Sequence, residues 1–104
     1  MTLDRIEANA EIVWGNLMEA RTYAAKAHAA KTEDRQEADW YIEMARRHLE
    51  FNNSGLPMLD RMVTEYAQGH THEGPGVQSV HKYRRAQWAT ETAGIQAMIA
   101  GFGK

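Results

Sequence analysis

Apolar and small residues recur along the first third of the chain at alternating steps of three and four. They fall at Leu3, Ile6, Ala10, Val13, Leu17, Ala20, Ala24 and Ala27. This is the spacing of a heptad repeat, which places one continuous apolar stripe along one side of an α-helix. The pattern predicts a long first helix over residues 3–30. A stripe of this length must be covered by the rest of the chain or by a second copy of it.

A second helical pattern begins after the short polar connection at residues 31–34. Its apolar stripe, widened by Trp40, Met44 and Phe51, predicts a helix that ends near residue 52. The run Asn-Asn-Ser-Gly-Leu-Pro at 52–57 combines residues that end helices with a proline that suits a helix start. It therefore favours a break followed by a short helix over residues 57–68. One long helix kinked at this run is the alternative.

The glycine-rich segment at residues 69–76 predicts a loop, and heptad-like spacing then predicts a last helix over about 78–100. The expected stripe of this helix is Val77, Val80, Arg84, Gln87 or Trp88, Glu91, Ile95, Met98 and Phe102. The sequence lacks the period-two alternation of strands. It predicts one all-α domain over residues 1–104, an antiparallel bundle of three to four helices with short loops.

Composition narrows the classes of function. The formal net charge of the 104-residue chain is -2, which gives no global field to attract nucleic acid or an anionic membrane. The absence of cysteine excludes disulfides, thiolate metal sites and cysteine nucleophiles. No apolar run approaches the roughly 18 residues of a membrane helix, and the acidic residues near the N-terminus do not fit a signal peptide. We therefore expect a cytoplasmic protein that does not bind membranes.

Several polar residues stand where the stripes call for apolar ones. They are Arg21, His28, His48, Arg84 and Glu91. We interpret them as a buried polar layer that fixes the register of the helices, as polar core positions do in coiled coils. If the last helix packs antiparallel to the first, Arg21 can reach Glu91.

The histidines offer an alternative chemistry. His70, His72 and Glu73 lie together in the predicted loop, and with His81 they could ligate zinc, nickel or copper. Haem bound through His28 or His48 and a methionine is a variant of the same idea. A di-iron centre is disfavoured because the chain has no Glu-x-x-His motif.

A second alternative is a small nucleic-acid-associated regulator. The basic and aromatic run at residues 81–85, followed by Trp88, could contact phosphates. The acidic balance elsewhere makes a solvated helix face the favoured interpretation of this run.

The favoured interpretation is a non-enzymatic interaction protein without a cofactor, because no nucleophile–base motif or phosphate-binding loop occurs. Three tryptophans, four tyrosines and six methionines exceed what so thin a core needs, and interfaces are rich in such residues. We expect a homodimer or higher oligomer, or an adaptor or structural subunit of a larger assembly, including a viral one. The expected interface residues are Trp14, Met18, Trp40 and Phe51.

Overall fold

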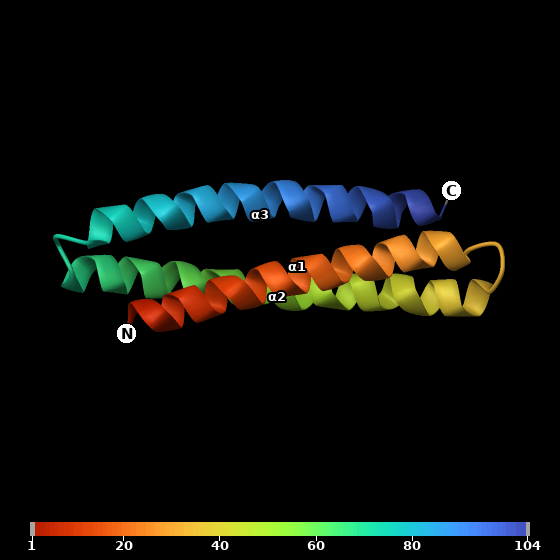
Figure 1. Ribbon diagram of the computed structural model, residues 1–104, viewed down its shortest axis with the longest axis horizontal. Helices are drawn as coiled ribbons and strands as arrows, with labels where there is room; N and C mark the ends of the chain where they lie inside the picture. The colour runs from red at the N-terminus through yellow and green to blue at the C-terminus, as the bar shows by residue number, and fades with distance from the viewer. Residues whose placement is uncertain (1, 104) are drawn as a thin grey trace.

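The computed structural model describes residues 2–103 as an elongated bundle of three helices (Figure 1). α1 spans Leu3–Ala30, α2 spans Arg35–Gly69 and α3 spans Gly74–Phe102. The chain runs up, down and up again, so that α3 lies parallel to α1 (Figure 1), and the molecule measures 56 × 19 × 15 Å. No strand occurs among the described residues. The predicted all-α bundle is confirmed, with three helices.

Side-chain caps fix where the first two helices begin. The hydroxyl of Thr2 accepts a hydrogen bond from the backbone N–H of Arg5 at 3.3 Å, and the carboxylate of Asp34 accepts one from the N–H of Glu37 at 3.0 Å. Such caps satisfy backbone donors that have no partner inside the helix. The bounds of α1 and the short connection at 31–34 follow the sequence prediction closely.

The predicted break at residues 52–57 is wrong, because α2 is a single helix that passes through Pro57. A proline inside a helix removes one backbone hydrogen bond, here to the carbonyl of Asn53, which is exposed and can be hydrated. The same face of α2 is buried by Leu49 before the run, by Asn52 at its first position and by Leu59 after it. Packing of this face against α1 overrides the local signals for a break. The alternative prediction of one long helix is therefore the correct one for α2.

The core lies mainly between α1 and α2, the most extensively packed pair of helices. Along α1 the predicted stripe from Ile6 to Ala27 is buried, and Leu17 has no exposed surface. α3 contributes three large buried side chains at seven-residue intervals, namely Trp88, Ile95 and Phe102. The sequence pattern places Val80 on the stripe of α3, but 47% of it is exposed and the partly buried position is His81.

The turn between α2 and α3 is shorter and tighter than the predicted loop. It comprises residues 70–73, and α3 begins at the buried Gly74. A β-carbon at Gly74 would lie 2.8 Å from both the α-carbon and the carbonyl oxygen of Ala67. The two helices can therefore approach this closely only because Gly74 has no side chain.

Candidate functional site

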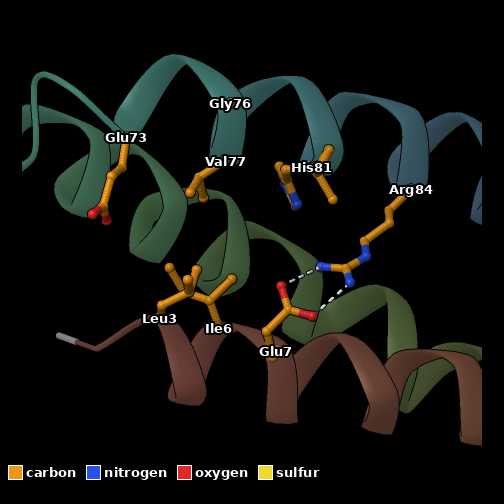
Figure 2. A pocket seen from close by; sticks show the side chains of 9 residues that line it. Leu3, Ile6, Glu7, Glu73, Gly76, Val77, His81 and Arg84 are labelled. Atoms are coloured by element: carbon orange, nitrogen blue, oxygen red, sulfur yellow. Dashed lines mark hydrogen bonds and ion pairs between the residues drawn. The ribbon is translucent and has the colours of Figure 1, made fainter.

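An ion pair joins α1 to α3 toward the end of the bundle where the α2–α3 turn lies (Figure 2). The guanidinium of Arg84 donates two hydrogen bonds to the carboxylate of Glu7, at 2.9 and 2.6 Å. These bonds lower the pKa of Glu7 and raise the pKa of Arg84, each against a smaller opposing effect of burial. The side chains are 45% and 27% exposed, respectively, so the pair lies at the edge of the core.

A second pair links the same two helices farther along. Arg21 donates a hydrogen bond to Glu91, as expected from the sequence, but the two helices that carry them are parallel. The predicted buried layer is wrong for Arg21, whose side chain is 52% exposed, and for His28, which is also exposed. Both residues flank the buried stripe of α1, so their long side chains reach α3 from the outside. His28 donates to the carbonyl oxygen of Met98 at 2.8 Å.

His48 occupies a comparable edge position between α1 and α2. Its Nε2 lies 3.5 Å from a carboxylate oxygen of Glu19, and its ring stacks on Tyr23 with 5.4 Å between ring centroids. In the described part of the chain, the buried polar side chain is Asn52, whose oxygen accepts a 3.5 Å hydrogen bond from the amide of Asn16. A polar core contact therefore exists, but between two asparagines that the sequence pattern does not single out.

The four candidate metal ligands are not brought together. His70 stacks on Tyr66 with the ring centroids 3.9 Å apart, and Glu73 accepts a hydrogen bond from the Tyr66 hydroxyl at 2.7 Å, which raises the pKa of Tyr66. His81 is turned to α2, where it donates to Asp60 at 2.6 Å. His72 is exposed on the turn. Within residues 2–103, no group of three or more acidic or histidine side chains is arranged to hold a metal ion.

The basic run on α3 is largely committed to contacts within the bundle. Arg84 pairs with Glu7, and Arg85 lies 3.1 Å from the same Asp60 oxygen that His81 contacts. These carboxylates compensate two of the cations that could have met phosphates. The arrangement favours a structural role for the run.

Three of the exposed large apolar side chains lie together between α1 and α2. Ile12 on α1 is 57% exposed, and Phe51 and Met58 on α2 are 68% and 53% exposed. The three line one groove of about 350 Å³, whose remaining walls include Asn9, Asn16 and Gly55. We call this feature the α1–α2 groove. It is the candidate functional site.

Two smaller hollows lie between α1 and α3. One, of about 270 Å³, is lined by Leu3, Ile6 and Val77 (Figure 2), and the other, of about 300 Å³, by Trp14. Both have Glu7 and Arg84 in their walls, so the ion pair stands between them. An apolar partner laid along this side would have to desolvate that pair, which makes it a poorer docking surface than the α1–α2 groove.

The predicted interface residues prove to lie in different places. Phe51 is in the α1–α2 groove, Trp14 faces α3, and Trp40 packs edge-on against Tyr23 near the other end of the bundle. Trp14 and Trp40 are 37% and 53% exposed, whereas Met18 is partly buried against the core. Trp14, Trp40 and Phe51 are thus exposed within one chain but do not form one contiguous patch, and their place in an interface stays a prediction. The sequence pattern does not group Phe51 with Ile12 and Met58.

Comparison of the chain with protein-family models, curated proteins and solved structures finds no significant match. Among the helices described, none is long and apolar enough to cross a membrane.

Proposed function

We propose that the protein is a helical association module, and that a second copy of the chain occupies its α1–α2 groove. The observation that carries this proposal is the gathering of Ile12, Phe51 and Met58, each more than half exposed, along one groove. Scattered exposed apolar residues are ordinary, but a contiguous patch on a small soluble domain marks an interaction surface.

The energetics of the groove support association. Full burial of one large apolar side chain stabilises a complex by about 1.5–3 kcal/mol. Three half-exposed side chains from each of two copies can therefore offset a substantial part of the cost of bringing two molecules together. Asn9 and Asn16 on the wall of the groove add polar groups of the kind found at interface rims.

The charges beside the groove favour a second copy as the occupant. Arg5 lies seven residues before Ile12 on α1, and Glu19 lies seven residues after it. Along α1, one end of the groove thus carries a cation and the other an anion, so that the α1 edge of the groove is complementary to the same edge of a second copy.

Sedimentation velocity on three proteins tests this proposal. The wild type should associate at micromolar concentrations, and the double variant Ile12→Ser/Phe51→Ser should be monomeric with an unchanged helical circular dichroism spectrum. Tyr83→Ser is the matched control, because Tyr83 is 70% exposed on α3, outside the groove. The control should associate as the wild type does.

Besides a wild type that stays monomeric, two results would overturn the proposal. One is association of the groove variant that equals that of the wild type. The other is loss of association in Tyr83→Ser alone, which would place the contact on α3. If the wild type stays monomeric but binds another protein through Ile12 and Phe51, the groove is a docking surface and the choice of a second copy is wrong.

A further inference from the structure

We infer that the two copies pack with their α1 helices antiparallel, so that Arg5 of each chain pairs with Glu19 of the other. This inference rests on the proposed function and adds the orientation and register of the partner. It depends on how three side chains are spaced along one line of α1.

Arg5, Ile12 and Glu19 are separated by seven residues each, which is nearly two turns of an α-helix. They therefore lie along one side of α1, and this is the side next to α2. Ile12 lines the α1–α2 groove, and Glu19 contacts His48 of α2. The side chain of Glu19 is still 62% exposed and Arg5 is exposed, so both charges are available to a partner.

Antiparallel packing of two such helices has one register that places Ile12 against Ile12. In that register the residue seven positions before the centre meets the residue seven positions after it. Arg5 of one copy then lies opposite Glu19 of the other, and the two-fold symmetry produces this pair twice. A shift by one helical turn would place apolar Ile12 against polar positions and separate the charges.

The α2 helices fit the same arrangement. Asn16 contacts Asn52 across the bundle, so the level of Ile12 on α1 corresponds to the neighbourhood of Gly55 on α2. Phe51 and Met58 lie on either side of Gly55, and antiparallel packing brings Phe51 of one copy to Met58 of the other. A β-carbon placed on Gly55 meets nothing within 4 Å, so the centre of the groove is open to a partner's side chain.

The competing arrangement has the two copies parallel, with α1 of each laid over α2 of the other. Arg5 would then lie near Glu65, which follows Met58 by seven residues on α2. The apolar contacts would be similar in both arrangements. The acidic partner of Arg5, which is Glu19 in the antiparallel arrangement and Glu65 in the parallel one, therefore distinguishes them.

Charge reversal with mixing tests the inference. The variants are Arg5→Glu and Glu19→Arg, measured separately and as an equimolar mixture by sedimentation equilibrium. Each variant alone places like charges opposite each other twice, and its dimer dissociation constant should rise about tenfold. In the mixed dimer, which holds one copy of each variant, both contacts between the chains again join a cation to an anion. Association of the mixture should therefore return to within about threefold of the wild type.

Lys82→Glu is the matched control, since Lys82 is exposed on α3 away from the groove. It should leave the dissociation constant unchanged. The double variant Arg5→Glu/Glu19→Arg provides a second test, because it should dimerise alone in the antiparallel arrangement. Circular dichroism of each protein checks that the fold is retained.

The outcomes separate this inference from the proposed function. A wild-type dimer whose charge variants are not restored by mixing, or whose double variant remains weak, overturns the antiparallel register and leaves self-association standing. A wild-type monomer overturns both. Restoration by mixing, with no effect of Lys82→Glu, supports both.

Discussion

Arg84 of α3 holds Glu7 of α1 through two hydrogen bonds, of 2.9 and 2.6 Å, across 77 residues of sequence. α3 buries only a few large side chains. Arg84 lies on the side of α3 that faces α1, where it meets Glu7. The bond geometry fixes both the rotation and the height of α3 against α1. It is therefore a point at which the third helix is aligned with the other two.

This pair predicts a pH dependence. Because Arg84 lowers the pKa of Glu7, the unfolded chain binds more protons than the folded one in acid. The stabilisation is complete above the ordinary glutamate pKa of about 4.3 and is lost as the pH falls through the lower value of the folded protein. Glu7→Gln should cost about 1 kcal/mol at neutral pH, since the site is partly solvated. Urea unfolding of both proteins from neutral pH to about pH 3 should show the difference shrinking; a constant difference would contradict this assignment.

Leu17→Asp should unfold the protein. Leu17 is fully buried at the centre of α1, where an unpaired carboxylate costs several kcal/mol, comparable with the whole stability of a small domain. Circular dichroism at neutral pH is the measurement. Gly15→Asp is a suitable control, because a side chain at Gly15 meets open space. A Leu17→Asp variant as helical and as heat-stable as the wild type would show that the core is assigned incorrectly.

Gly74→Ala should destabilise the turn between α2 and α3. The added β-carbon would lie 2.8 Å from the backbone of Ala67, so one helix must move, at a cost of about 1–3 kcal/mol. Gly76→Ala, two residues later in α3, places its β-carbon in open space and should stabilise the helix by up to about 1 kcal/mol. Thermal unfolding compares the two variants. Equal melting temperatures would mean that the close approach at Gly74 is not required.

The sequence predicts α1 well because its stripe of apolar residues is unbroken and every stripe residue from Ile6 to Ala27 is buried in the core. It fails at residues 52–57 because capping and proline signals are local, whereas the burial of Leu49 and Leu59 on one face depends on the neighbouring helix. The expectation that the last helix is antiparallel to the first depended on this extra break. With one helix fewer, α3 is parallel to α1, although the Arg21–Glu91 contact still forms.

The candidate site was only partly predictable. Phe51 is expected at an interface, but the sequence pattern assigns Met58 to a separate short helix that does not exist. The groove is defined by residues of two helices at the same level, and their pairing depends on a register that the contact between Asn16 and Asn52 reveals. A single chain's apolar pattern carries no information about that register. The predicted buried polar layer is wrong for Arg21 and His28, because these residues flank the apolar stripe of α1 and do not occupy it.

The most direct test of the central claim is the molar mass of the wild-type protein, measured by sedimentation equilibrium from low to high micromolar concentration at neutral pH and moderate salt. Self-association through the α1–α2 groove predicts a mass that rises with concentration toward twice that of one chain. A mass that stays at that of one chain throughout this range would contradict the account.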